Sequence, residues 1–344
     1  MASDMTAGLP HYFLEKSLHV KKNVYFCSLN NNDKKVSMKR TLVILSIFVT
    51  ALATMVSCKK EDPALVAVGD GMLKGEFSVS PEKKVRFSKG NLQCLITDVA
   101  TKTVVWNFAS TQYEAIGSGN SAIGAANTNA IDLFGWGTSG WESGAVAYQP
   151  YSFSTTNSDY WPGGDAKNNL TGTCMKADWG RNNPIMNGGM LPGAWRVLTS
   201  EEWEYLIKGR PNAEAKLGVG AVLANHGLIL LPDNWTPPAD TNVKFISGLN
   251  PRVGTQDYNI NWYSEEDWQK MEETGAVFLP VTGYRNGKTV DGFDFHGTQV
   301  GNYWSSTAQR PSTALGLHFT SDKIVPQSYA YRHFGRAVRL VRDI

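Results

Sequence analysis

The segment Trp195–Arg210, W-R-V-L-T-S-E-E-W-E-Y-L-I-K-G-R, contains the start and the end of one helix. Thr199 is a suitable N-cap, and Glu202, three residues later, can reach back to complete a capping box. Gly209 and Pro211 then end the helix, because glycine favours helix C-termini and proline cannot continue the hydrogen-bond ladder.

The apolar residues of this segment divide into two patterns. Trp203, Leu206 and Ile207 recur at helical spacing and give the helix one apolar face. Trp195 and Val197 precede the cap and alternate with a polar residue, as at the end of a strand. The segment therefore predicts a strand that leads directly into a helix, which carries a large tryptophan into the core.

The residue order of this segment resembles the R-L-P-T-E-A-E-W-E-Y signature of proteins related to formylglycine-generating enzyme. The second half of that signature, G-x-x-V-R-L-V, is matched by Gly335–Val341. The resemblance implies a C-type-lectin-like fold.

Residues 74–344 are also similar to Bacteroidetes surface lipoproteins with a Fibrobacter-succinogenes-major-type domain. The recurring phrases are F-S-K-G-N-L-Q at Phe87–Gln93, I-D-L-F-G-W-G-T-S-G at Ile131–Gly140, G-A-V-F-L-P at Gly275–Pro280 and Y-W-S-S at Tyr303–Ser306. The similarity implies a single C-type-lectin-like domain over residues 74–344.

The periodicity of the remaining chain predicts an α+β domain with two main helices, short antiparallel strands and long aromatic-rich loops. Ser264 is expected to cap the second helix, Glu265–Glu273. A hairpin is expected over Ala221–Leu231, turning at Asn225-His226-Gly227, and Tyr148–Pro192 is expected to be a long loop. The other main strands are expected at Leu92–Ile96, Val104–Phe108, Ala276–Leu279, Gly301–Thr307, Ala314–Thr320, Lys323–Gln327 and Arg336–Arg342.

The composition of the 344 residues, 42% hydrophobic and 19% charged, is that of a chain with a large core. The net charge of +2 is concentrated at the start, where residues 1–57 hold 7 basic and 3 acidic residues. The rest has 26 basic and 28 acidic residues, so nothing in its charge predicts a nucleic-acid partner.

An export signal is expected inside the N-terminal region. Residues 38–57 combine a basic start with the apolar run Thr41–Val56. Cys58 follows directly, and the segment Met55–Cys58 resembles a lipobox. The alternative is a transmembrane helix, but the run is shorter than the roughly 20 residues that span a bilayer. Residues 1–37 are then a doubtful upstream extension, and residues 58–73 are a tether behind the lipidated Cys58.

The tether begins with the charged cluster Lys59-Lys60-Glu61-Asp62, which resembles a surface-export signal of Bacteroidetes lipoproteins. The expected location is therefore the outer membrane, with the domain exposed on the cell surface. In an exported chain Cys94 and Cys174 could form a disulfide, and the sequence leaves their pairing open.

The sequence gives little support for a catalytic or metal site. The oxidase chemistry of the formylglycine-generating relatives needs two cysteines in the C-terminal part, and no cysteine follows Cys174. Leu231–Trp235 is the nearest echo of a lectin calcium motif and is expected to be an ordinary turn, while Asp291 and Asp294 alone are too few for calcium. Four of the six histidines, His226, His296, His318 and His333, follow residue 58 and are scattered. No cofactor or metal is predicted.

A binding surface is expected between the phrases Tyr303–Ser306 and Gly335–Val341. Arginine and tyrosine are enriched there, and both are common at binding hot spots. In related proteins of diversity-generating retroelements this segment is the hypervariable ligand face, whereas the alternative is an inert sheet edge. The candidate ligand-binding residues are Gln309, Arg310, Ser312, Ser328, Tyr329, Tyr331, Arg332 and His333.

These observations predict a non-catalytic, lipid-anchored cell-surface protein that binds a glycan or another macromolecule. Two alternatives stay open: an enzyme of the formylglycine-generating superfamily with altered chemistry, and a structural subunit of a surface assembly.

Overall fold

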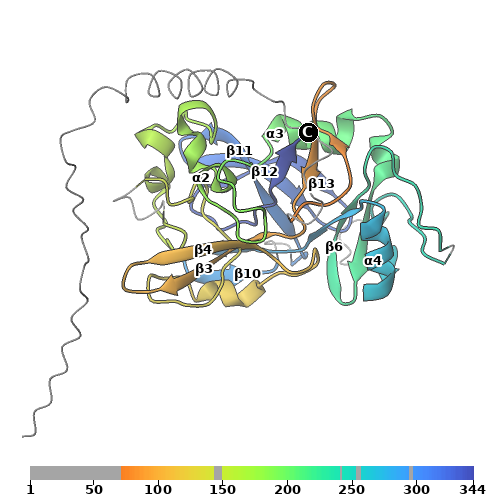
Figure 1. Ribbon diagram of the computed structural model, residues 1–344, viewed down its shortest axis with the longest axis horizontal. Helices are drawn as coiled ribbons and strands as arrows, with labels where there is room; N and C mark the ends of the chain where they lie inside the picture. Colours follow the sequence, from red (N-terminus) through yellow and green to blue (C-terminus); the bar gives the residue numbers. More distant parts are fainter. Residues whose placement is uncertain (1–70, 143–148, 241, 253–256, 294–296) are drawn as a thin grey trace, which may run out of the picture. The chain divides into compact units, whose positions relative to one another are not determined.

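The computed structural model describes residues 71–142, 149–240, 242–252, 257–293 and 297–344 (Figure 1). These residues form an α+β domain in which small sheets predominate over a few helices, as expected. The expected extension 1–37, the signal peptide 38–57 and Cys58 lie outside the described residues. Within the described part, no helix is both long and apolar enough to cross a membrane.

The strands form five small sheets within the described residues. Three of them hold β1 (Phe77–Ser78), β2 (Lys84–Phe87) and β14 (Val341–Asp343); β3 (Leu92–Asp98) and β4 (Thr103–Phe108); and β9 (Tyr284–Asn286) and β10 (Thr289–Asp291). A four-stranded sheet has the order β7 (Asn261–Tyr263), β5 (Leu217–Val222), β6 (Asn225–Leu230) and β8 (Val277–Pro280). The fifth contains β11 (Gly301–Arg310), β12 (Thr313–Phe319) and β13 (Ile324–Tyr331), all antiparallel.

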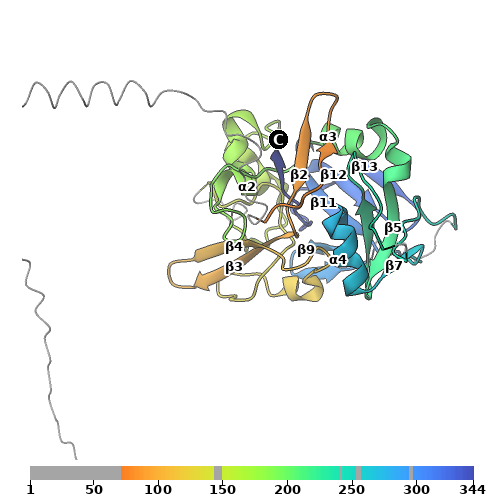
Figure 2. The same cartoon turned by 45° about the vertical axis from the view of Figure 1, so that its right-hand side comes forward.

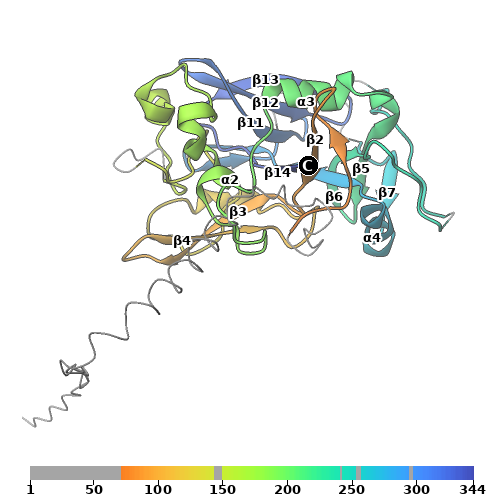
Figure 3. The ribbon, with the colours of Figure 1, turned by 45° about the horizontal axis from the view of Figure 1, so that its top comes forward.

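The helix predicted after Thr199 is present. It comprises α3 (Ser200–Glu204) and a π-helical turn, η7 (Tyr205–Gly209), and its capping box is complete. The Glu202 backbone N–H donates to Thr199 Oγ1 over 3.1 Å, and the Thr199 N–H donates to Glu202 Oε2 over 2.9 Å. The helix packs on the β11–β12–β13 sheet, beside which Figure 3 shows it.

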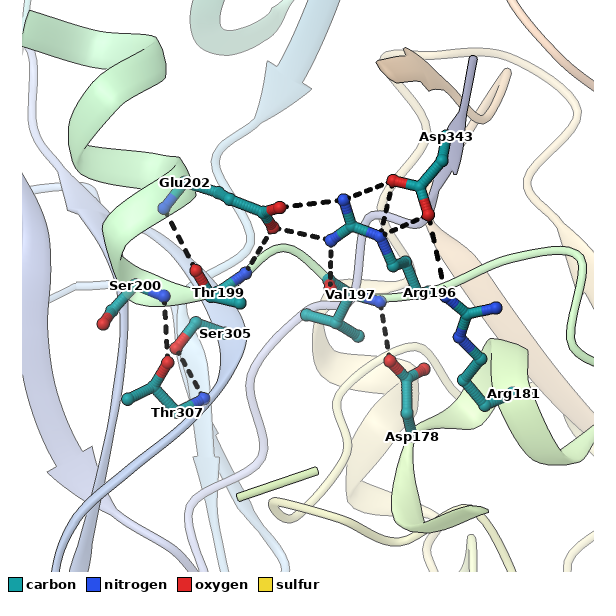
Figure 4. A network of polar contacts seen from close by, with 10 residues as sticks. All are labelled: Asp178, Arg181, Arg196, Val197, Thr199, Ser200, Glu202, Ser305, Thr307 and Asp343. Carbon is teal, nitrogen blue, oxygen red and sulfur yellow. Dashed lines mark hydrogen bonds and ion pairs between the residues drawn. The ribbon is translucent and has the colours of Figure 1, made fainter. Parts of the chain in front are cut away.

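A network of ion pairs fixes the start of this helix (Figure 4). Arg196 pairs with Glu202 over 2.6 Å and with Asp343 over 2.5 Å, so it joins the cap to the last strand, β14. Burial opposes ionisation of Asp343, but the hydrogen bonds from Arg196 outweigh it and lower the pKa of Asp343. Asp178 accepts from the Val197 N–H over 2.8 Å, and burial raises its pKa to about 6. Residues far apart in the sequence therefore hold the cap.

The second predicted helix, α4 (Glu265–Glu273), is also present and is capped by Ser264. Its Trp268 and Met271 are buried in a separate apolar cluster with Val222 and Phe278. Figure 2 shows α4 beside the sheet that contains β5 and β7. A further short helix, α2 (Trp179–Asn182), begins at the N-cap Asp178.

The turn of the predicted hairpin is displaced. Val222 pairs with Asn225, so the turn is Leu223-Ala224, and the expected turn residues Asn225-His226-Gly227 belong to β6. Leu223 accepts the left-handed conformation that this turn requires, with φ 56°. Gly227 pairs with Gly220 of β5 and Pro280 of β8, and a side chain there would lie 2.5 Å from the ring of Phe278, so this strand position requires glycine.

The last predicted strand, Arg336–Arg342, is shorter than expected. Only Val341–Asp343 is a strand, because the preceding residues change partners almost one by one. Arg336 bridges to Phe134, and Ala337 bridges to Tyr303. The segment therefore crosses the middle of the domain instead of following one neighbour.

Two boundaries left open by the sequence are clear in the structure. Met72 and Leu73, expected at the end of the tether, are buried, and the Leu73 N–H donates to the Phe87 carbonyl over 2.8 Å. Cys94 and Cys174 are both buried free thiols, so they do not form a disulfide. Burial raises the pKa of the Cys94 thiol.

The long segment that follows residue 148 is tied down by its own side chains. Tyr160 is fully buried, and the Trp161 indole N–H donates to the Pro311 carbonyl over 2.6 Å. The Leu170 N–H donates to the Ser306 carbonyl over 2.9 Å. These contacts place the long loop against the turn between β11 and β12.

Candidate binding surface

An open pocket of about 860 Å³ lies over the β11–β12–β13 sheet. Residues of all three strands line the pocket, and Tyr284 of β9 is also among the lining residues. Its lining residues are Tyr284, Val300, Asn302, Gln309, Arg310, Ser312, Thr313, His318, Lys323, Ser328, Tyr329, Ala330, Tyr331, Phe334 and Arg336.

Six of the eight candidate binding residues line this pocket: Gln309, Arg310, Ser312, Ser328, Tyr329 and Tyr331. The register explains their proximity, because Thr313 of β12 pairs with Arg310 on one side and Tyr331 on the other. The sequence instead predicts Ser328 beside the Pro311 turn. Ser328 pairs with Gly316, farther along β12, because the strands are longer than expected.

The rim of the pocket carries exposed aromatic and cationic side chains. Tyr329 is 66% exposed and Tyr331 is 50% exposed, and Arg310 is exposed beside them. The ring of Tyr331 stacks on His333 with centroids 5.5 Å apart, and it meets the edge of Phe334 at 5.5 Å. The rim therefore offers flat apolar faces that are held by neighbouring rings.

The sequence interpretation is wrong for Arg332. Its side chain is fully buried, with the guanidinium 4.6 Å from the ring centroid of Trp136. It donates hydrogen bonds to the carbonyl oxygens of Thr313, Tyr160, Ala166 and Arg310. Arg332 therefore ties the long loop to the β11–β12 turn, and its side chain is not accessible to a ligand on this surface.

His333 is also largely covered, at 9% exposed. Its Nδ1 lies 2.9 Å from Asn157 Oδ1. Burial, together with the charge of Arg285, lowers the pKa of His333, so its ring is neutral at pH 7. It supports Tyr331 from behind, whereas the sequence suggests a direct ligand contact.

The buried base of the pocket is missed by the sequence interpretation. Its members are Val300, Asn302, Thr313, Ala330 and Arg336, all at most 9% exposed. Arg336 belongs to the phrase Gly335–Val341, which the sequence interpretation assigns to the framework. No periodic signal marks it, because its side chain reaches the pocket from a segment without regular strand structure.

The described histidine, cysteine and acidic side chains do not form a metal site. Over the described ranges, no group of three or more histidine, cysteine or acidic side chains is placed to hold a metal ion. Asp233, in the calcium-like turn Leu231–Trp235, accepts hydrogen bonds from the Ser78 N–H and hydroxyl over 2.9 and 2.6 Å. It also pairs with Arg210 over 3.4 Å, so it has a structural role. Asp291 accepts from the Phe293 N–H, and Asp294 lies outside the described residues.

Comparison with protein-family models, with curated proteins and with solved structures finds no match to this chain. The arrangement of residues around the pocket is therefore the basis for inferring its function.

Proposed function

We propose that this chain is a non-catalytic, lipid-anchored surface protein whose C-type-lectin-like domain binds a glycan or another macromolecule at the open pocket. The observation that carries the proposal is the position of Arg310, Tyr329 and Tyr331. They stand exposed on the rim of an open pocket, on strands β11 and β13, which are both hydrogen-bonded to β12 between them. A preformed surface lowers the ordering cost of binding, and exposed arginine and tyrosine give large contact areas.

The fold assignment within this proposal rests on the two helices, the small antiparallel sheets and the long loop packed beside the pocket. The long loop is expected in a C-type-lectin-like domain. For the alternative functions, an enzyme with altered chemistry or a structural subunit, the described residues offer no comparable arrangement as support.

Replacing Arg310, Tyr329 and Tyr331 together by alanine should abolish binding. Hot-spot residues each contribute about 2 kcal/mol or more, so the affinity should fall at least 100-fold. The unfolding free energy should change little, because exposed substitutions rarely cost more than about 0.5 kcal/mol each. A glycan array run with and without calcium identifies the ligand, and titration calorimetry of the variant gives the loss.

The matched control is Trp262→Ala, which removes a 63% exposed aromatic from β7, away from the pocket. It should leave the affinity unchanged. If the triple variant folds and still binds, the ligand lies elsewhere and the proposed surface is wrong.

The lipid anchor has its own test. Cys58→Ala should release the protein from membranes into the soluble fraction, because the modified thiol is the proposed attachment point. Fractionation and mass spectrometry of the mature protein measure this, with Cys27→Ala as the control that should change nothing. Peptides from residues 1–37 on the mature protein would contradict both the anchor and the start at Met38.

A further inference from the structure

Arg336 is a buried cation whose guanidinium has no carboxylate partner among the described residues. Its side chain is 6% exposed and lines the pocket. Its Nε and Nη1 atoms have no hydrogen-bond partner, and no carboxylate within the described ranges pairs with it. Other buried arginines are different, since Arg210, Arg285 and Arg332 all donate to backbone carbonyls.

The guanidinium of Arg336 is nevertheless held in position. Its backbone exchanges two hydrogen bonds with Phe134, each 3.0 Å long. Its Cζ lies 5.0 Å from the ring centroid of Trp304, whose indole N–H donates to the Phe134 carbonyl over 2.7 Å. One face of the guanidinium is therefore fixed against an immobile aromatic ring, as in a cation–π pair.

An isolated buried charge is costly, and such charges normally have a paired or hydrogen-bonded partner. Burial lowers the pKa of Arg336 to about 9, so the side chain still carries its charge at pH 7. The cost is offset when an anion enters the pocket and pairs with the guanidinium of Arg336, which lines it. An arginine fork binds planar carboxylates and the oxygens of sulfate or phosphate with strong charge-assisted hydrogen bonds.

The rest of the pocket fits an anion attached to a sugar. Its other charged lining residues are the cations Arg310 and Lys323, and among the described residues that line it there is no carboxylate. Hydroxyl and amide groups that can bond sugar hydroxyls come from Asn302, Gln309, Ser312 and Ser328, while the exposed tyrosine rings offer stacking faces.

We infer that the pocket binds an acidic carbohydrate, with the carboxylate or sulfate of the sugar on Arg336. This inference rests on the proposed binding function and names its ligand class. Arg336 then serves as the anion anchor at the base, and the tyrosines at the rim hold the sugar ring.

The test compares an acidic sugar with its neutral ester and with two further acidic probes. Titration calorimetry uses the full chain in detergent, as wild type and as Arg336→Met. The probes are tetragalacturonate, its neutral methyl ester, a chondroitin sulfate tetrasaccharide and a tetraglutamate peptide. A hydrogen-bonded charge pair predicts a preference of about 10- to 100-fold for an acidic sugar over the ester in the wild type. Arg336→Met should remove that preference. Tetragalacturonate carries carboxylates alone, whereas the chondroitin sulfate tetrasaccharide carries carboxylates and sulfates, so tighter binding of the latter indicates a contribution from sulfate.

Stability gives a second readout that a purely structural arginine would not produce. Without ligand, Arg336→Met should unfold at the same or a higher temperature than the wild type, because it removes an unpaired buried charge and keeps similar volume. Arg336→Lys, which keeps the charge but not the fork, should retain part of the preference. If Arg336→Met is markedly less stable than the wild type, Arg336 has a structural role and the inference fails.

The remaining outcomes separate the ligand class from the binding function. Equal affinity for acid and ester, or a preference that survives Arg336→Met, overturns the anion site while the proposed function stands. Tighter binding of tetraglutamate than of any sugar replaces the carbohydrate with an acidic peptide. If no acidic sugar binds the wild type at millimolar concentration, the inference is wrong. The proposed function fails as well only if the full glycan array yields no ligand that the Arg310, Tyr329 and Tyr331 variant loses.

Discussion

Replacing Trp203 by alanine should lower the free energy of unfolding by about 3–5 kcal/mol, the usual cost of truncating a buried aromatic. Trp203 is fully buried and packs in one apolar cluster with Leu206, Leu317 and Phe319. Its ring centroid lies 6.1 Å from that of Phe87. The substitution therefore leaves a cavity where α3 meets both β2 and the sheet that carries the pocket. Urea unfolding followed by circular dichroism measures the loss.

Two variants isolate the cause. The Trp203 indole N–H has no hydrogen-bond partner among the described residues, so Trp203→Phe loses volume but no bond seen there and should cost clearly less than alanine. Trp262→Ala removes a 63% exposed indole and should cost no more than about 0.5 kcal/mol. An unchanged midpoint for Trp203→Ala would show that α3 is peripheral to the stability of the domain.

Arg332→Met should be destabilised by at least about 3 kcal/mol and should also lose ligand binding. The substitution leaves four backbone carbonyls without their charged donor, and each unsatisfied buried group costs about 1–3 kcal/mol. Two of those carbonyls, of Arg310 and Thr313, flank the β11–β12 turn at the pocket rim. The rim should therefore lose its fixed position together with the long loop. Thermal unfolding and titration calorimetry measure the two effects.

Arg310→Met is the control, since that side chain is exposed at the same turn. It should weaken binding and leave the unfolding temperature nearly unchanged. Wild-type stability for Arg332→Met would contradict the structural role assigned here. The comparison with Arg336→Met is sharper, because two buried arginines of one segment are expected to have opposite effects on stability. The difference is whether the protein itself supplies acceptors for the guanidinium.

The sequence alone determined the features that depend on neighbours along the chain. The capping box of Thr199 and Glu202 and the Ser264 cap connect residues three positions apart, so their hydrogen bonds follow from spacing. The alternation of Leu315, Leu317 and Phe319 predicts one buried side of β12. Leu317 and Phe319 are buried as expected, but Leu315 is only half-buried, and Ala314 and Gly316 on the other side are buried as well because β12 is the central strand. The α+β class and the proximity of β11 and β13 follow from these local patterns.

Only the tertiary structure decided the roles of individual polar side chains. Arg310 and Arg332 are both predicted ligand contacts and Arg336 a framework residue, yet Arg310 is exposed and Arg332 donates to backbone carbonyls. Arg336 is buried, and its Nε and Nη1 have no hydrogen-bond partner among the described residues. Those fates depend on Tyr160, Ala166 and Trp304, which packing brings in from elsewhere in the chain. The position of the hairpin turn also depends on a distant segment, since Gly227 pairs with Pro280 of β8 as well as with β5. Local hydrogen bonds are encoded by spacing, whereas burial and pairing of a charge depend on which distant segments fold against it.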